Sequence, residues 1–264
     1  MKGVICYYSG SGNTKLVCKA IVRNLAQVEF DLYDITKHKS LEAEHYDIWG
    51  FATFTDFVGP PQLFISFVEN LPAQKDRWAF ILNTYGYING RTLLEIDKLV
   101  RGRGFRILAG HSLHTPESFP PMIAAGNSNE QAPNEKELKM FRSFVSDLEE
   151  KVGLMQSGQT PQPSPLHVGL INRCIPVYQR THARKDMGEK FIDDTICKAC
   201  GVCEKRCPYH AISLAPKPVF DMRKCYGCWA CYNHCPNHAI YTHKYRGIGY
   251  YPRPLEELRR KLDV

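Results

Sequence analysis

The sequence predicts an α/β domain with a doubly wound parallel sheet of five strands, followed by a second, smaller α+β domain. Three observations lead to this prediction. The chain has 264 residues, more than a typical single domain of about 100–200 residues. Apolar runs alternate with segments of helical periodicity over residues 1–153, whereas the last third carries a repeated cysteine pattern. A proline-rich stretch lies between these two regions.

Five apolar runs are the predicted strands, and they cover residues 3–8, 29–33, 48–52, 78–83 and 106–112. Segments with helical periodicity fall between or after them, at residues 14–25, 63–70, 93–101 and 135–151. Alternation of strand and helix is typical of a parallel sheet with helices on both faces. We therefore expect residues 1–153 to form one doubly wound domain.

The rest of the chain divides into three predicted parts. Residues 154–190 are a linker and connecting segment, because the prolines and polar residues of 156–165 favour extended chain. Residues 191–245 form the second domain. Residues 246–264 form a C-terminal tail, in which 255–262 has the pattern of a short amphipathic helix that docks on a domain.

Eight of the eleven cysteines lie in two copies of the pattern C-x2-C-x2-C-x3-C-P. The first copy consists of Cys197, Cys200, Cys203 and Cys207, and the second of Cys225, Cys228, Cys231 and Cys235. The second copy lies 28 positions after the first, and His-Ala-Ile begins three residues after each fourth cysteine. This internal duplication predicts a domain of two related halves.

The spacing is that of bacterial 4Fe-4S sites, where thiolates hold the irons and the fourth cysteine of each run ligates the other cluster. One cluster is therefore expected on Cys197, Cys200, Cys203 and Cys235. The other is expected on Cys225, Cys228, Cys231 and Cys207. A structural zinc site is the alternative, but zinc ribbons need neither the third cysteine nor the proline.

The other thiols, Cys6, Cys18 and Cys174, are expected to be small buried apolar side chains. Aromatic side chains within the cysteine motifs are expected to pack over the clusters and limit access of water; they are Tyr209, Tyr226 and Trp229.

A loop of small polar residues, Ser9-Gly10-Ser11-Gly12-Asn13-Thr14, follows the first predicted strand and opens the first helix. Free amides and hydroxyls at a helix N-terminus favour a phosphate. Neither G-x-x-x-x-G-K-[ST] nor G-x-G-x-x-G is present, so neither a nucleoside triphosphate nor a dinucleotide is expected. A monophosphate is the natural ligand, and a plain helix cap is the alternative.

This loop resembles the [ST]-x-[ST]-G-N-T loop of flavodoxins, which holds the phosphate of FMN, and the resemblance covers roughly residues 1–150. It implies phosphate contacts from Ser9, Ser11, Gly12, Asn13 and Thr14. It also implies that two later loops flank the isoalloxazine ring, through Thr53, Phe54, Thr55, Phe57, Thr84, Tyr85, Gly86 and Tyr87. The usual tryptophan of the second loop is missing, and Phe54 or Phe57 could replace it.

The whole chain resembles the flavodoxin-ferredoxin fusion proteins of anaerobes. That resemblance implies a flavodoxin-like domain with FMN, a bacterial ferredoxin-like domain with two 4Fe-4S clusters, and electron transfer between FMN and a redox partner through the clusters. Reduction of a small substrate at the flavin is an extension, with His114, Glu117 and Tyr85 as candidate proton donors. The alternative is a pure electron carrier without substrate chemistry.

The net charge of +7 is spread along the chain, which gives no nucleic-acid-binding stripe. Basic residues near the second domain favour an acidic redox partner; they are Arg173, Arg180, Arg184, Lys185, Lys190 and Arg223. No run of about 20 apolar residues predicts a membrane span. The cysteine usage and the lack of a signal-peptide pattern predict a cytoplasmic location.

Overall fold

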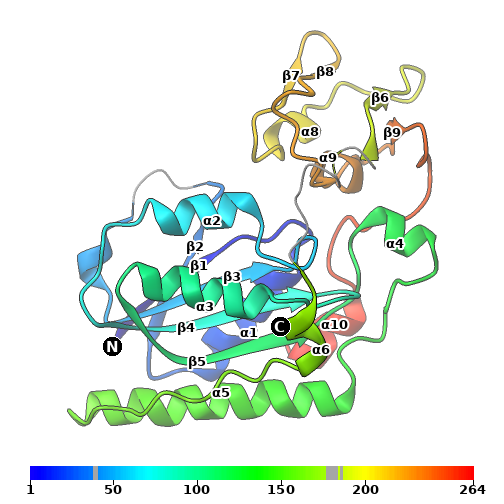
Figure 1. Cartoon of the computed structure of the whole chain (residues 1–264). Coiled ribbons are helices and arrows are strands. Elements are labelled where there is room, and N and C mark those ends of the chain that lie inside the picture. The colour runs from blue at the N-terminus through cyan, green and yellow to red at the C-terminus, as the bar shows by residue number, and fades with distance from the viewer. Residues whose placement is uncertain (38–40, 177–183, 185–186) are drawn as a thin grey trace.

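The computed structural model describes residues 1–37, 41–176, 184 and 187–264. Its first domain is a five-stranded parallel sheet of order β2-β1-β3-β4-β5 (Figure 1). The strands are β1 (Lys2–Tyr7), β2 (Glu29–Asp34), β3 (Ile48–Phe54), β4 (Arg77–Tyr85) and β5 (Phe105–His114). This is the doubly wound order of the flavodoxin-like folds, and it confirms the predicted fold class.

Helices cover both faces of the sheet and enclose two apolar cores. The main helices are α1 (Asn13–Asn24), α2 (Gln62–Glu69), α3 (Thr92–Gly102) and α5 (Glu135–Gln156), and the shorter ones are η1 (Ala43–His45), α4 (Pro120–Ala124) and α6 (Leu170–Cys174). Side chains of α1 and α5 form one core, and those of α2 and α3 form the other. Figure 1 shows α2 and α3 on the face opposite α5.

The thiols outside the cysteine motifs separate into two groups. Cys6 and Cys18 are fully buried in the α/β domain, as expected. Cys174, at the end of α6, is exposed, so the prediction of a buried side chain is wrong there. Helix α6 has no buried residue, and therefore offers no core for this thiol.

The second domain reproduces its duplicated sequence as duplicated structure. The elements of the first half are β6 (Lys190–Ile192), α8 (Val202–Lys205) and β7 (Ile212–Leu214), and those of the second half are β8 (Pro218–Phe220), α9 (Ala230–Asn233) and β9 (Ile240–Thr242). Each element of the second half begins and ends 28 positions after its counterpart. Antiparallel pairing joins β6 to β9 and β7 to β8, so both ladders link the two halves.

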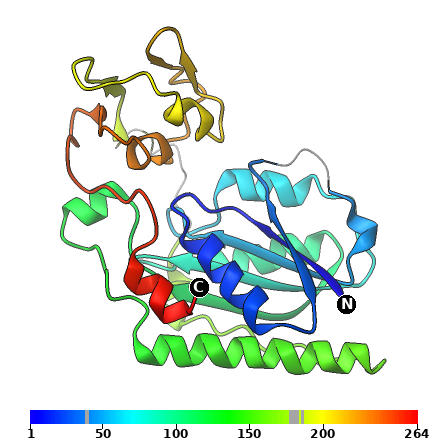
Figure 2. The ribbon, with the colours of Figure 1, turned by 180° about the vertical axis from the view of Figure 1, so that it is seen from behind.

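The C-terminal tail returns to the first domain. Its helix α10 (Glu256–Leu262) lies beside α1, as Figure 2 shows. Leu258 and Leu262 are buried in the same core as α1 and α5, and Arg23 pairs with Asp263 at 3.0 Å. The predicted amphipathic helix is thus docked on a domain. Within the described part of the chain, no helix combines the length and apolarity that crossing a membrane requires.

We expect Leu258→Ala to lower the free energy of unfolding by about 2–5 kcal/mol, because it leaves a cavity in a fully buried site. Urea denaturation followed by circular dichroism measures this change. Leu170→Ala is the matched control, since Leu170 is 79% exposed, and it should change stability by less than about 0.5 kcal/mol. Equal effects of the two substitutions would contradict the docking of α10.

Candidate redox site

The cysteine motifs enclose two small cavities. Four cysteines line the first cavity, namely Cys197, Cys200, Cys203 and Cys235. The other four line the second cavity, namely Cys207, Cys225, Cys228 and Cys231. Each cavity thus takes three cysteines from one run and the fourth from the other run. The structure brings together the same two sets of thiols that the sequence predicts as ligand sets.

The fourth cysteine of each run lies in the cavity of the other run, and we call it the crossing cysteine. In both halves, a backbone amide donates a hydrogen bond to its sulfur. The Ala211 amide donates to Cys207 Sγ at 3.3 Å, and the Ala239 amide donates to Cys235 Sγ at 3.2 Å. Amide-to-sulfur hydrogen bonds stabilise thiolates and are among the factors that tune cluster potentials. The two cavities are therefore alike in the backbone that surrounds them.

One side chain makes the second cavity chemically different. Lys190, on β6, is 7% exposed, and its Nζ donates to Cys225 Sγ at 2.9 Å. Burial acts to lower the pKa of Lys190, but the nearby thiols of Cys231 and Cys225 outweigh it, and the pKa lies above its ordinary value. A buried ammonium group thus faces this set of cysteines.

A larger cavity of about 310 Å³ lies at the carboxyl edge of the sheet. Loops after β1, β3, β4 and β5 form one wall, and α4 and the second domain form the other. The lining residues are Gly10, Ser11, Phe54, Thr55, Asp56, Phe57, Val58, Gly86, Tyr87, Ile88, Glu117, Ser118, Phe119, Met122, Tyr226, Cys228, Trp229, Ala230 and Asn233. This is the edge where doubly wound sheets bind ligands, and we call this space the sheet-edge cavity.

The residues predicted for FMN divide between this cavity and its surroundings. Ser11, Phe54, Thr55, Phe57, Gly86 and Tyr87 line the cavity. Ser9 and Gly12 line a neighbouring cavity instead. Asn13, Thr14, Thr53 and Thr84 are buried and line neither of these two cavities. The ring of Tyr85 stacks on His114, with centroids 5.0 Å apart. The cofactor contacts of all these residues remain predictions.

The loop before α1 has the geometry of an anion cradle. Ser9 Oγ accepts hydrogen bonds from the amides of Gly12 and Lys15, at 3.1 and 3.2 Å, which fixes the shape of the loop. Gly12 has φ +102°, and a Cβ there would lie 2.8 Å from Cδ of Pro254, so only glycine fits. Among the described residues, the amides of Ser11 and Asn13 have no protein acceptor, which leaves them to an anion at the helix N-terminus.

Hydrogen bonds hold the second domain against this loop. Asn233 donates to the Ser118 carbonyl at 3.0 Å and accepts from the Tyr251 amide at 3.2 Å. The hydroxyl of Tyr251 donates to Asn13 Oδ1 at 2.9 Å, and Asn13 donates to the Pro116 carbonyl at 3.0 Å. These side chains are buried. They connect α9, the tail and the start of α1.

A second set of contacts crosses the sheet-edge cavity. Tyr226 donates its hydroxyl to Asp56 Oδ2 at 2.8 Å and accepts from the Gln62 amide at 3.2 Å. Trp229 packs edge-on against Phe119 at 6.1 Å, and is 2% exposed. The aromatic side chains Tyr209, Tyr226 and Trp229 also line the second cysteine cavity, as expected. Tyr226 and Trp229 line both cavities and therefore lie between them.

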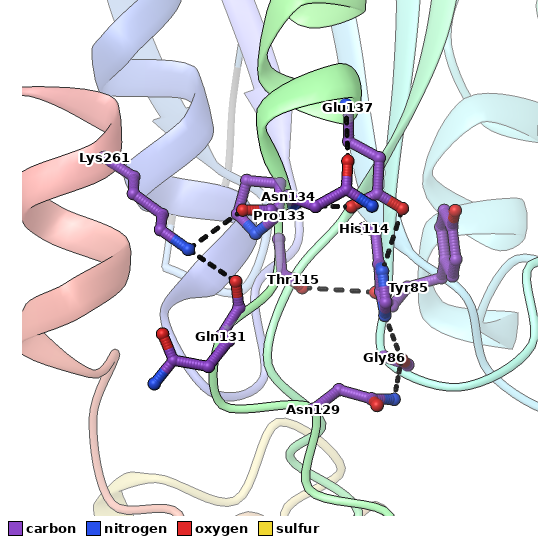
Figure 3. Close-up of polar contacts among 10 residues, drawn as sticks. All are labelled: Tyr85, Gly86, His114, Thr115, Asn129, Gln131, Pro133, Asn134, Glu137 and Lys261. Carbon is purple, nitrogen blue, oxygen red and sulfur yellow. Dashed lines mark hydrogen bonds and ion pairs between the residues drawn. The ribbon is translucent and has the colours of Figure 1, made fainter.

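Of the three candidate proton donors, only Glu117 lines the sheet-edge cavity. Figure 3 shows His114 between Glu137 and Gly86: its Nδ1 lies 3.0 Å from Glu137 Oε1, and its Nε2 lies 2.7 Å from the Gly86 carbonyl. Burial raises the pKa of Tyr85 to about 12. Burial also raises the pKa of Glu117 above its ordinary value, although the amides of Ser118 and Phe119 donate to its Oε1.

Several cavity residues have no signal in the sequence. They are Val58, Ile88, Ser118, Phe119, Met122, Ala230 and Asn233, whereas Tyr226, Cys228 and Trp229 were predicted only as parts of the cluster sites. Phe119 is followed by two prolines, which favour a chain direction change, but nothing indicates what it faces. The contribution of the second domain depends on docking, which no motif encodes.

A fourth, basic cavity of about 520 Å³ lies on the other side of the Ser9–Thr14 loop, which we call the phosphate loop. Its basic lining residues are Lys15, Lys37, Lys205, Arg206 and Arg253, against the acidic Asp34 and Glu204. Cys207 also lines this basic cavity. Of these cations, only Lys37 has an ion pair among the described residues, with Asp34 at 3.3 Å.

The basic residues predicted to attract a partner lie elsewhere. Lys190 is buried beside Cys225, so its predicted role on the surface is wrong. Arg173 and Arg223 are exposed and Arg184 is half-buried. The last two members of the predicted set, Arg180 and Lys185, lie outside the described residues.

Residues 190–213 and 218–241 match the family model of the 4Fe-4S binding domain (Fer4). This match confirms the predicted 4Fe-4S chemistry and decides against zinc. A comparison with curated proteins found no match.

Solved structures that are similar to this chain cover its first domain. An archaeal flavodoxin has 17% identity and a TM-score of 0.41, over 58% of this chain and 99% of that one. A flavodoxin from Streptococcus pneumonia TIGR4 has 15% identity and a TM-score of 0.44, over 57% and 99%. Rubredoxin oxygen:oxidoreductase from Desulfovibrio gigas has 10% identity and a TM-score of 0.45, over 59% and 37%. The strand order β2-β1-β3-β4-β5 identifies the fold of the first domain.

We expect Tyr251→Phe to lower the free energy of unfolding by about 1–3 kcal/mol, because it leaves the buried Asn13 Oδ1 without its donor. Urea denaturation measures this loss. Tyr250→Phe is the matched control, since the hydroxyl of Tyr250 makes a long, exposed hydrogen bond of 3.3 Å. If both substitutions had the same small effect, Tyr251 would not connect the tail to the phosphate loop.

Proposed function

We propose that this chain, which joins a flavodoxin-like domain to a 4Fe-4S binding domain, passes electrons between a redox partner and FMN through two 4Fe-4S clusters. One observation carries the proposal: Cys228 lines both the second cysteine cavity and the sheet-edge cavity. A cluster held by the second set of thiols would therefore adjoin a flavin held at the sheet edge. FMN exchanges electrons singly or in pairs, which suits it to a neighbour that exchanges them singly.

The sheet-edge cavity fits FMN in three respects. It is lined by the rings of Phe54, Phe57 and Tyr87, which offer flat apolar surfaces to an isoalloxazine ring. The free amides of Ser11 and Asn13 suit a phosphate. The volume of about 310 Å³ is at the low end of the range for ligand pockets of about 300–1,000 Å³.

That volume also favours an electron carrier over an enzyme with a separate substrate. A flavin ring in this cavity leaves little space for a second molecule, and Tyr226 and Trp229 of the second domain close its far wall. Glu117 is the only candidate proton donor in the lining, and it can hold a proton that accompanies flavin reduction. Reduction of a small substrate remains the second candidate.

The basic cavity is the proposed docking surface for an acidic redox partner. Lys205 and Arg206 are exposed beside Cys207, and no ion pair within the described residues neutralises them. Opposite charges speed the encounter of redox proteins and orient them. Along the chain, Lys205 and Arg206 lie between Cys203 of the first set and Cys207 of the second set, so a partner seated there would lie near ligands of both clusters.

Anaerobically purified protein should contain about eight irons and one FMN, the loading of two 4Fe-4S clusters and one flavin. Iron, sulfide and acid-released flavin analysis measures this, and the visible spectrum after dithionite addition shows whether flavin is reduced with the clusters. Protein with eight irons but no flavin, or with flavin that stays oxidised beside reduced clusters, would exclude the proposed route.

Cys235→Ser tests, within the same assay, whether Cys235 is a cluster ligand. It should lower the iron content toward half, because the first cluster would lose a thiolate that comes from the second run. Cys174→Ser is the matched control at an exposed thiol outside the motifs and should keep full loading.

The double substitution Lys205→Glu and Arg206→Glu should slow reduction by an acidic ferredoxin about tenfold or more at low salt, with the difference shrinking as salt rises. Stopped-flow absorbance measures the rate. Lys136→Glu with Lys139→Glu is the matched control: it changes the net charge equally, on exposed positions of α5, far from the second domain in Figure 1. Equal slowing by both pairs would show that only net charge matters.

A further inference from the structure

We propose that Lys190 makes the cluster held by Cys207, Cys225, Cys228 and Cys231 the more easily reduced of the two, and so directs electrons toward the sheet-edge cavity. The inference rests on the proposed function for its clusters and adds the direction of electron flow. Its basis is one buried contact, the 2.9 Å hydrogen bond from Lys190 Nζ to Cys225 Sγ, and one break in the internal symmetry of the domain.

The symmetry break lies at the first residue of corresponding strands. Lys190 begins β6, and the residue 28 positions later, Pro218, begins β8. Lys190 lines the second cysteine cavity, whereas Pro218 lines the first. Two equivalent places in the duplicated fold therefore present an ammonium group to one set of thiols and an apolar ring to the other.

The amide hydrogen bonds to the fourth cysteine of each run are alike in the two halves, although the lining of the first cavity includes the exposed Lys198 and Cys200. The crossing cysteines Cys207 and Cys235 each accept one amide hydrogen bond, from Ala211 at 3.3 Å and Ala239 at 3.2 Å. Hydrogen bonds to sulfur and net charge are main determinants of cluster potential. With these two hydrogen bonds matched, the main difference in charge is that Lys190 of the second cavity is buried, whereas Lys198 of the first cavity is exposed to water.

A buried positive charge favours the addition of an electron nearby. Lys190 is only 7% exposed, so water screens its charge weakly. The cluster beside it should therefore have the higher potential. Since Cys228 of that site also lines the sheet-edge cavity, the favoured resting place of an electron is the site next to the proposed flavin.

Each cluster takes up one electron, and no bond forms or breaks. In the experiment, dithionite supplies the electrons and is oxidised. A redox titration of the protein with about eight irons, followed by electron paramagnetic resonance, should resolve two one-electron steps. Lys190→Met should shift the step of higher potential toward negative potential by about 59 mV or more. That shift is a tenfold change in the equilibrium constant of a one-electron step.

Two further variants separate charge from structural damage. Lys190→Arg keeps the positive charge and should leave both steps within about threefold of the wild type. Lys198→Met removes an exposed charge beside Cys197 of the first site and should move neither step as far as Lys190→Met, because water screens an exposed charge. A Lys190→Met protein with full iron and unchanged steps would overturn the proposal.

If Lys190→Met does not load iron, the wild type and Lys190→Arg decide. A single common potential for both clusters of the wild type would overturn the proposal, whereas two separate steps that Lys190→Arg retains would support it. Iron and flavin content are determined separately, so loss of the proposed function and loss of the Lys190 effect give different results.

Discussion

The buried hydrogen bond between Tyr251 and Asn13 joins the three parts on which the site depends. Asn13 begins α1 and lies in the phosphate loop, while Tyr251 belongs to the tail and contacts Asn233 of the second domain. A buried polar group that loses its partner costs about 1–3 kcal/mol, so these groups keep one arrangement. The sheet-edge cavity exists only in that arrangement, because one wall comes from each domain.

Duplication gives the second domain two cysteine sites with corresponding ligands, but the residues around the two sites differ. Gly201 and Trp229 occupy corresponding places before α8 and α9, and both have positive φ, 72° and 62°. A bulky residue in this conformation is strained, at a cost of order 1–3 kcal/mol. Burial of the indole against Phe119 and Tyr232 offsets that cost. The second half thus keeps a large ring where the first half keeps a glycine, and that ring lines the sheet-edge cavity.

Much of this arrangement is local in sequence and could be predicted. Strand and helix periodicity predicted the doubly wound sheet, because the apolar runs of its central strands, such as β1 and β3, are buried on both faces. The cysteine spacing predicted which thiols meet, because tight turns around a cluster demand it. The role of Lys190 was misjudged, because charge on a short strand gives no sign of burial, and Cys174 was misjudged because helix periodicity does not reveal whether a helix has a neighbour.

The parts that could not be predicted are those created by docking. Phe119 and Met122 reach the cavity because α4 lies between the sheet edge and α9, and Figure 1 shows how the chain leaves the sheet to do so. Tyr226 reaches it because Asp56 holds its hydroxyl. Such contacts join residues more than a hundred positions apart, and a motif, which records only short-range spacing, cannot carry them.

Docking also determines which of the two cysteine sites faces the flavodoxin-like domain. An isolated duplicated domain could present either half to a partner, since its halves are related by the 28-residue repeat. Here the tail leaves β9 and ends in α10, which is buried against α1. Asn233, just after Cys231, is held at the same time by Ser118. Together these two anchors turn α9 and its cysteines toward the sheet edge and leave the first set of thiols outside the sheet-edge cavity. Chain connectivity therefore supplies the asymmetry that a duplicated sequence alone lacks.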